Sequence, residues 1–305
     1  MPDFTGGWSP AIRCYSPPVN YDHRFHAGNF ADVHKHVVLI ALLERLSEKP
    51  APWFYLDTHA GAGLYELDRL PQDPPPEFRR GFEILWQATP IDPLLARYRA
   101  LVASDNPSGC LTRYPGSPLL ARRLSRPHDR LAFVEVVPQR QAELKRHLGR
   151  RPGVHHRDGF EALLALTPPT ERRGLVFIDP PYEQVSEADR LVETLPRACA
   201  RFPQGVFLAW YPWADANWTN GLKRRLSRIP RISFLDWLSP PRDGLWGSGL
   251  ALVNVPHGLP ERLDRLQPEL RSLFRDRLGT TEWRTTWATE GDRDTPARAP
   301  RGPKR

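Results

Sequence analysis

The sequence predicts an α/β protein built around a doubly wound, mostly parallel sheet of seven strands, with a small helical insertion. Two observations support this fold class. Short runs rich in β-branched and aromatic residues alternate with longer stretches of helical apolar spacing, which is typical of strands covered by helices. The chain has 305 residues, of which 40% are hydrophobic and 26% charged, so it can bury the core of one large domain.

The expected elements follow the chain in order. A long amphipathic helix at 32–49 comes first, with Val33, Val37 and Ile40 expected to face inward. Seven runs are predicted to be strands, at 53–58, 131–136, 153–158, 174–179, 205–211, 231–237 and 249–255. Helical spacing recurs between them at 136–149, 186–202 and 220–229. Such alternation predicts parallel strands joined by crossover helices.

One segment departs from this alternation. Residues 66–112 contain helix-like stretches but no convincing strand, and a crossover connection needs far fewer residues. We therefore expect a helical insertion at about 66–112 within one domain at 19–285. Residues 1–18 are expected to be a flexible lead-in, and residues 286–305 a disordered basic tail.

The charge balance favours a polyanionic partner. The formal net charge is +8 at pH 7, and cationic side chains that neutralise phosphates release counterions. Residues 291–305 hold five cations and two acids, a net of +3, although such a tail can also serve only to keep the protein soluble. No apolar run approaches the roughly 18 residues of a membrane span, and no signal peptide pattern is present. We expect a cytoplasmic protein with no membrane partner.

Candidate binding residues follow the ends of the predicted strands, where open α/β sheets bind their ligands. The first strand leads into DTHAGAG, in which Gly61 permits a tight turn and a close approach of the backbone to a ligand. This glycine pattern is weak by itself. Glu135 ends the second strand and could accept hydrogen bonds from ribose hydroxyls, and Asp158 with Gly159 ends the third. Each acid could instead be a helix cap.

The most informative motif is the turn Asp179–Pro180–Pro181–Tyr182 after the fourth strand. Because prolines fix φ and remove backbone donors, the Asp179 carboxylate and the Pro180 carbonyl form a pair of acceptors. A nucleobase amine offers two N–H donors beside a flat π surface, against which the ring of Tyr182 could stack. The turn therefore predicts a catalytic site that binds an amine and orients its lone pair.

Together these motifs resemble a known family. Similarity to the RlmJ family extends over roughly residues 20–285 and is carried by NYDHRFHAGNFADVHKH (20–36), YPGSPLLA (114–121), RDGF (157–160), IDPPYE (178–183) and AWYP (209–212). Members of this family are class I S-adenosylmethionine-dependent methyltransferases with a Rossmann-like fold, and they methylate N6 of an adenine in 23S ribosomal RNA. The resemblance implies S-adenosylmethionine as the cofactor, 23S ribosomal RNA as the partner and no obligate protein partner.

The resemblance also implies roles for individual residues. Asp179 would be the catalytic residue, with Pro180 and Tyr182 beside it. The cofactor pocket would be lined by Lys35, His36, His59, Gly61, Ser117, Glu135, Asp158, Gly159 and Asp179. Tyr21 would contact the RNA, although Asp22 follows it where the family commonly has an arginine. The adenine would be unpaired or flipped out, in naked RNA or an early assembly intermediate.

Other functional classes stay open at this point. A DNA adenine or protein glutamine methyltransferase would use a similar turn, but glutamine enzymes usually carry Asn where Asp179 stands, and no separate DNA-recognition region is visible. A non-catalytic RNA-binding module would keep only a relic pocket, against which the intact turn argues. Two segments are crowded with histidines, namely His23, His26, His34, His36 and His59. Neither an HExxH motif nor a cysteine pair accompanies them, so we expect no metal.

Overall fold

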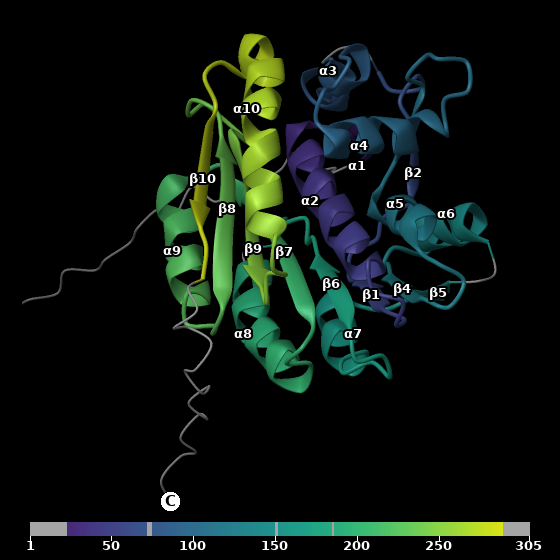
Figure 1. Ribbon diagram of the computed structural model, residues 1–305, viewed down its shortest axis with the longest axis vertical. Helices are drawn as coiled ribbons and strands as arrows, with labels where there is room; N and C mark the ends of the chain where they lie inside the picture. The colour runs from purple at the N-terminus through teal and green to yellow at the C-terminus, as the bar shows by residue number, and fades with distance from the viewer. Residues whose placement is uncertain (1–22, 72–74, 150–151, 185, 289–305) are drawn as a thin grey trace, which may run out of the picture.

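The computed structural model describes residues 23–71, 75–149, 152–184 and 186–288. The lead-in predicted at 1–18 and residues 289–305 of the predicted tail lie outside these residues. The described chain forms a central sheet between layers of helices (Figure 1). None of the helices in this described part is long and apolar enough to cross a membrane.

An eight-stranded sheet forms the centre of the described chain, in the order β10-β8-β9-β7-β6-β1-β4-β5. Its strands are β1 (Phe54–Asp57), β4 (Arg130–Val134), β5 (Gly153–His155), β6 (Gly174–Ile178), β7 (Val206–Trp213), β8 (Ile232–Leu238), β9 (Gly247–Val253) and β10 (Glu282–Thr286). β1 pairs in parallel with β4 and β6, and β5 and β7 extend this parallel block on either side. All seven predicted strands are present, which confirms a mostly parallel, Rossmann-like sheet.

The predicted count of seven strands is one too few, because the sequence pattern misses β10. This strand pairs antiparallel with β8, and Trp283 is its one buried residue. A short edge strand with mostly exposed polar side chains shows neither the alternation nor the apolar run by which a strand is recognised in a sequence. Its pairing with β8, rather than its own pattern, defines it.

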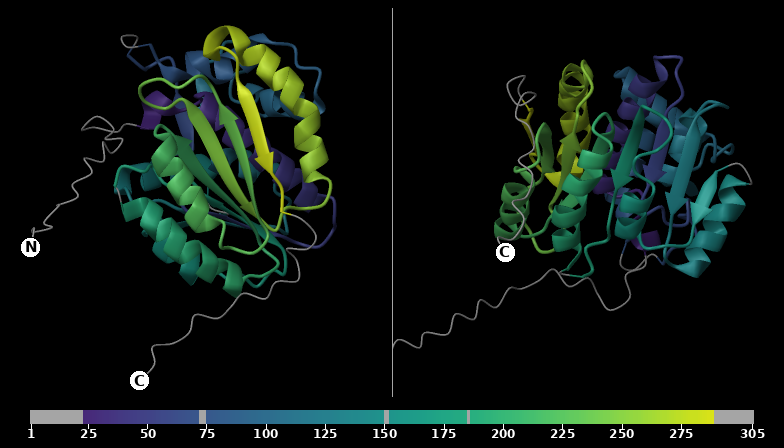
Figure 2. Two further views of the ribbon diagram at one scale, coloured as in Figure 1. Left: turned by 90° about the vertical axis from the view of Figure 1, so that its left-hand side faces the viewer. Right: turned by 90° about the horizontal axis from the view of Figure 1, so that it is seen from below.

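Helices cover both faces of the sheet (Figure 2). They are α1 (His23–His26), α2 (Phe30–Ser47), α5 (Ser117–Leu124), α6 (Pro138–Leu148), α7 (Gly159–Ala165), α8 (Ser186–Arg201), α9 (Ala216–Leu226) and α10 (Leu259–Leu278). On one face α2 lies against β6 and β9 and contacts α5 and α10, while α8 contacts α7 and α9. The chain is therefore wound on both sides of β1, as in other doubly wound sheets.

The segment at 66–112 contains the 3-10 helix η1 (Glu77–Arg80) and the helices α3 (Phe82–Gln87) and α4 (Pro93–Ala103). A short antiparallel pair, β2 (Leu64–Glu66) and β3 (Arg113–Pro115), brackets it. Its helices pack on α2 and α10, and the Phe82 N–H donates to the Gly28 carbonyl at 2.7 Å. The segment therefore covers the start of α2.

α2 is buried on all sides over residues 30–43, rather than only along the stripe that includes Val33, Val37 and Ile40. The sheet lies on one side of it, and α4, α5 and α10 surround the rest. This buried stretch includes four polar residues: Asp32, His34, Lys35 and His36. Because buried polar groups need partners, these side chains mark the place where the centre of the molecule carries chemistry.

Candidate active site

A cavity of about 470 Å³ opens where β1, β4, β6 and β7 end, beside the start of α2. Its volume is in the range of about 300–1,000 Å³ that small-molecule sites occupy. The predicted site residues that line it are Lys35, His36, His59, Gly61, Ser117, Glu135, Asp158, Gly159, Asp179 and Pro180. Tyr182 is not among the lining residues, and Tyr21 lies outside the described residues. The cavity lies where the strand order reverses around β1, the expected place for a ligand.

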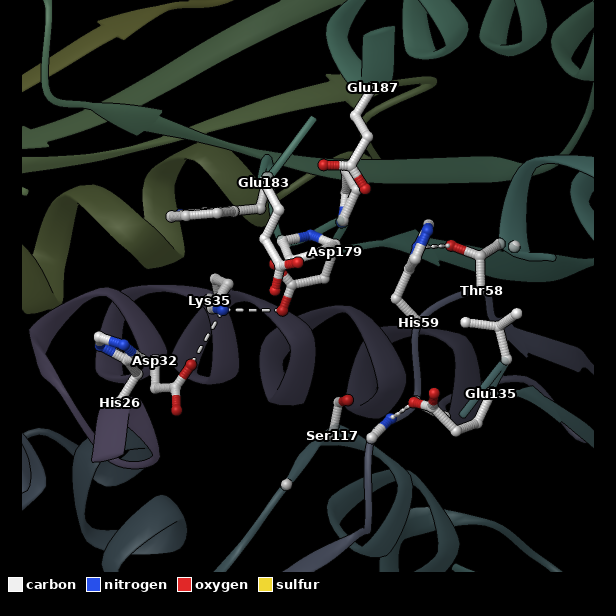
Figure 3. Close-up of a pocket in the computed structure, with 18 of the residues that line it drawn as sticks. His26, Asp32, Lys35, Thr58, His59, Ser117, Glu135, Asp179, Glu183 and Glu187 are labelled. Carbon is white, nitrogen blue, oxygen red and sulfur yellow. Dashed lines mark hydrogen bonds and ion pairs between the residues drawn. The ribbon is translucent and has the colours of Figure 1, made fainter. Parts of the chain in front are cut away.

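Lys35 connects α2 to the turn that carries Asp179. Its Nζ lies 2.7 Å from Asp179 Oδ2 and 2.9 Å from Asp32 Oδ1 (Figure 3). The same ammonium group lies 4.7 Å from the centroid of the Trp210 ring. Burial alone would lower the pKa of Lys35, but the carboxylates of Asp179 and Asp32 raise it above its ordinary value. Lys35 is therefore a buried cation with two anionic partners.

Asp179 keeps one carboxylate oxygen for a ligand. Its Oδ2 accepts from Lys35, whereas its Oδ1 has no hydrogen-bond partner within the described ranges. The side chain is 15% exposed and lines the cavity together with Pro180. Burial raises the pKa of Asp179, and the Lys35 ammonium opposes that rise. The turn thus borders the cavity with an acceptor whose charge Lys35 stabilises.

Tyr182 differs from the expected stacking residue. Its side chain is 7% exposed, its hydroxyl donates to the Trp210 carbonyl at 2.7 Å, and its ring centroid lies 5.6 Å from that of Trp218. Its φ is 55°, an uncommon conformation for a bulky residue. The ring packs behind the cavity instead of offering a free face, and Trp210 is the tryptophan that lines the cavity.

Glu135 is fixed against the glycine turn. Its carboxylate accepts from the Gly61 N–H at 2.9 Å and from the Val137 N–H at 2.8 Å. Gly61 has a φ of +64°, and a Cβ there would lie 2.4 Å from the Tyr65 hydroxyl, so the turn requires glycine. Each carboxylate oxygen can accept a further hydrogen bond, which leaves capacity for the hydroxyl donors expected at Glu135.

Asp158 is a helix cap that also lines the cavity. Its Oδ1 accepts from the backbone N–H groups of Phe160 and Glu161, each at 3.0 Å, at the start of α7. Its Oδ2 accepts from Arg190 Nη1 at 2.9 Å. Although burial acts in the opposite direction, these donors hold the pKa of Asp158 below its usual value. The capping alternative is therefore confirmed for this acid.

Gly159 packs directly against His59. A Cβ at Gly159 would lie 2.4 Å from the Thr58 carbonyl oxygen and 2.7 Å from the His59 ring. His59 Nδ1 lies 2.8 Å from Thr58 Oγ1 (Figure 3), and burial lowers the pKa of His59 to about 4. His59 is therefore neutral at pH 7, in a position that only a glycine neighbour permits.

Asp57, the last residue of β1, is a buried acid that the sequence interpretation did not assign to the site. Its Oδ2 accepts from Ser117 Oγ at 2.7 Å and from the Tyr55 hydroxyl at 3.0 Å. Burial raises the pKa of Asp57 to about 7, even though both hydroxyls act in the opposite direction. The signal that could have identified Asp57 is its place at the carboxyl end of a buried strand.

Asp32 and Trp210 are two further residues at the cavity that were not predicted from the sequence. Asp32 precedes Lys35 by three positions, the spacing of an ion pair on a helix, and this spacing could have identified it. Trp210 belongs to β7, in which every residue is buried, so its pattern is that of an ordinary core strand. The burial pattern of the strand does not distinguish Trp210 from its neighbours, and its only signal in the sequence is its place in AWYP (209–212), one of the motifs that carry the resemblance.

The histidines are held apart by separate partners. His36 Nδ1 lies 2.8 Å from the Tyr114 hydroxyl, and His34 Nδ1 lies 2.9 Å from Ser248 Oγ. Within the part of the chain that the structure describes, no group of three or more His, Cys, Asp or Glu side chains could hold a metal ion. Among the described residues, the crowding of histidines in the sequence does not become a cluster that could hold a metal ion.

The fold and the site define a class I methyltransferase of the Rossmann-like type. Residues 50–289 match the family described as Ribosomal RNA large subunit methyltransferase D, RlmJ. Ribosomal RNA large subunit methyltransferase J of Escherichia coli K12 is 36% identical over 261 residues, which cover 83% of this chain and 93% of that protein. The protein of the same name from Haemophilus influenzae is 34% identical over 279 residues, covering 89% and 99%. The chain therefore belongs to the RlmJ family of ribosomal RNA large subunit methyltransferases.

A solved structure agrees with this assignment. The crystal structure of a protein from Legionella pneumophila strain Philadelphia 1 superposes with a TM-score of 0.80 at 32% sequence identity, and the match covers 87% of this chain and 99% of that one. The shared fold therefore extends over most of this chain.

Proposed function

We propose that this protein transfers the methyl group of S-adenosylmethionine to N6 of an adenine in 23S ribosomal RNA. The observation that carries the proposal is the Asp179–Lys35 pair, in which Lys35 holds one oxygen of Asp179 at 2.7 Å and the other borders the cavity without a partner among the described residues. An acceptor of this kind suits an amine N–H. Family membership supports the ribosomal RNA of the large subunit as the substrate.

The cavity fits S-adenosylmethionine by size and charge. Gly61 and Gly159 line the cavity without a side chain, so the backbone can approach a ligand closely there. Glu135 and Asp158 supply carboxylates to the wall, and neutral His59 does not repel a cation. The remaining candidates for cofactor contact are Lys35, His36 and Ser117. When bound, S-adenosylmethionine supplies a methyl group activated by the positive charge on its sulfur.

The proposed role of the chain is placement and charge stabilisation. Asp179 Oδ1 and the Pro180 carbonyl accept the two N–H groups of the adenine amine, which directs the nitrogen lone pair at the methyl carbon. With S-adenosylmethionine bound, the N–C bond would form as the bond from the methyl carbon to sulfur breaks, and the sulfur would keep the electron pair. The amine then loses a proton, and Asp179 is the nearest acceptor. The Lys35 ammonium favours the ionised form of Asp179 and so opposes the effect of burial.

The substrate would approach a cationic surface. Arg80 in η1 and Arg242 in the loop between β8 and β9 are exposed, and both segments adjoin residues that line the cavity, His26 and Leu245. Burial is the main cause that lowers the pKa of Arg242, and the positive charge of Arg80 lowers it further. A phosphodiester would relieve this repulsion. A base buried in a helix could not reach Asp179, so the target adenine is unpaired or flipped out.

The test is transfer of labelled methyl from S-adenosylmethionine by the wild type and Asp179→Ala. Each is offered protein-free 23S RNA, assembled large subunits, duplex DNA and a glutamine-containing protein. We expect N6-methyladenine in protein-free RNA with the wild type and none with the variant. Label only in DNA or in glutamine would move the substrate to one of those classes. Failure to bind S-adenosylmethionine, with no transfer to any substrate, would leave a non-catalytic RNA-binding module.

A further inference from the structure

A buried chain of three polar side chains lies behind the Asp179–Lys35 pair. It runs from His34 on α2 through Ser248 on β9 to Trp210 on β7. Ser248 Oγ lies 2.9 Å from His34 Nδ1 and 3.0 Å from Trp210 Nε1. His34 and Ser248 are fully buried, and Trp210 is 9% exposed. The three side chains come from elements that meet only in the folded protein.

Ser248 Oγ links the other two side chains of this chain. An indole N–H can only donate, so Ser248 Oγ accepts from Trp210 Nε1. A serine hydroxyl has one hydrogen and two acceptor positions, so it pairs with His34 Nδ1 in either tautomer of the histidine. Burial, with a smaller contribution from Lys35, lowers the pKa of His34 to about 3, so its ring is neutral. The ring lies edge to face against Trp283, with 5.2 Å between the two centroids.

The indole ring that this chain holds carries the Lys35 ammonium on its face, 4.7 Å from the centroid. Lys35 has two carboxylate partners, Asp32 at 2.9 Å and Asp179 at 2.7 Å. A lysine on a flexible stem could settle on Asp32 alone, which would leave Asp179 without its cation. A fixed aromatic face keeps the ammonium between the two carboxylates.

We propose that Trp210 is a positioning residue that holds the Lys35 ammonium against Asp179, and that Ser248 and His34 fix the angle of its ring. The inference rests on the proposed function, because it assigns a task to residues beside the proposed catalytic acid, of which Trp210 also lines the cavity. Trp210 acts through Lys35 and needs no contact with the substrate. Its effect should therefore fall on the chemical step and on the ionisation of Asp179.

The test compares Trp210→Phe and Ser248→Ala with a matched control, Trp213→Phe. Trp213 lies on the same strand and is 3% exposed, its indole N–H donates to Asp236 at 2.8 Å, and Lys223 lies 5.5 Å from its centroid. It does not line the cavity. Trp213→Phe therefore removes a buried indole and its hydrogen bond, as Trp210→Phe does, but at a position away from Asp179.

In methyl transfer to 23S RNA, we expect Trp210→Phe and Ser248→Ala each to lower kcat about tenfold, with KM for S-adenosylmethionine within about twofold of the wild type. The acid limb of the pH–rate profile should move to higher pH, since Asp179 without its cation is protonated more readily. Trp213→Phe should leave kcat and the profile unchanged even where it lowers Tm. A loss of kcat no larger than that of the control, or a rise confined to KM for the cofactor, would overturn the proposal.

A second measurement tests the positioning role of Trp210 without methyl transfer. Carboxyl-carbon NMR of protein labelled at aspartate, with the Asp179 signal assigned by its loss in Asp179→Asn, gives the protonation constant of Asp179 directly. We expect protonation about tenfold tighter in Trp210→Phe and Ser248→Ala and no change in Trp213→Phe. An unchanged constant in both variants would contradict the positioning role even if the RNA were methylated. A changed constant without methyl transfer would support the role while overturning the proposed function.

Discussion

Two largely buried lysine–aspartate pairs lie beside tryptophans in the described part of the chain, one in each half of the sheet. In the parallel half, Lys35 pairs with Asp179 and lies over Trp210. In the antiparallel half, Lys223 pairs with Asp236 and lies over Trp213.

The two aspartates differ in how many of their acceptor positions the protein occupies. Asp236 Oδ1 accepts from the Tyr211 hydroxyl at 2.7 Å and from the Trp213 indole at 2.8 Å, and its Oδ2 accepts from Lys223. Asp179 has one oxygen without a protein partner in the described chain, at the wall of a cavity. A buried acid with protein donors on both oxygens stabilises the fold, whereas one with an oxygen that has no protein donor and borders a cavity can bind a substrate.

The largest expected effect separates the two aspartates by activity. Asp179→Ala removes the acceptor of the adenine amine and should lower kcat for methyl transfer about 10³-fold. Asp236→Asn should leave kcat within about twofold, since no substrate reaches that residue. Single-turnover transfer at saturating S-adenosylmethionine measures both, and equal losses would remove the distinction.

The free energy of unfolding should fall more in Asp236→Asn than in Asp179→Ala, the reverse of the order expected for activity. Asp236→Asn leaves Lys223 without its anion and puts an amide N–H₂ where donors converge, so we expect the free energy of unfolding to fall by about 2–3 kcal/mol. Asp179→Ala should cost less, because Lys35 keeps Asp32. Urea unfolding followed by circular dichroism measures both values. If Asp236→Asn were as stable as the wild type, the Lys223–Asp236 pair would not stabilise the fold.

The close packing of the parallel half can be tested at Gly159. Gly159→Ala places a Cβ 2.4 Å from the Thr58 carbonyl and displaces the His59 ring, so we expect binding of S-adenosylmethionine to weaken about tenfold, which is roughly 1.4 kcal/mol. Gly221→Ala is the matched control, because a Cβ there meets nothing within 4 Å. Calorimetric titration gives both affinities. Equal affinities in the two variants would place the cofactor elsewhere.

The smallest expected effect concerns a third buried acid, Asp57. Burial raises the pKa of Asp57 to about 7, above its ordinary value of about 3.9. The stability that the protonated form contributes is therefore fully present below about pH 3.9 and is lost as the pH rises through about 7. Asp57→Asn removes that titration. Between pH 6 and pH 7, the wild type should lose roughly 1 kcal/mol more stability than Asp57→Asn. Urea midpoints at the two pH values measure the difference, and parallel curves would mean that Asp57 is ionised throughout.

The sequence alone determined most of the central sheet. Seven strands were recognisable because each is a short apolar run bounded by turns, and residues such as Glu135 and Asp179 could be placed at one cavity because parallel strands end at the same edge of a sheet. The glycines at 61 and 159 could be assigned by the same rule, since they follow strand ends.

Tertiary structure alone decided the rest. β10 is a strand because β8 offers it an edge, and Tyr182 lies behind the cavity because Trp210 accepts its hydroxyl and Trp218 covers its ring. Local pattern reports which side chains avoid water, but it does not report which residue distant in the chain will supply a partner. Asp179 has one carboxylate oxygen without a protein donor in the described chain, whereas Asp236 has donors on both oxygens. This difference depends on partners distant in the chain, and so it exists only in the folded protein.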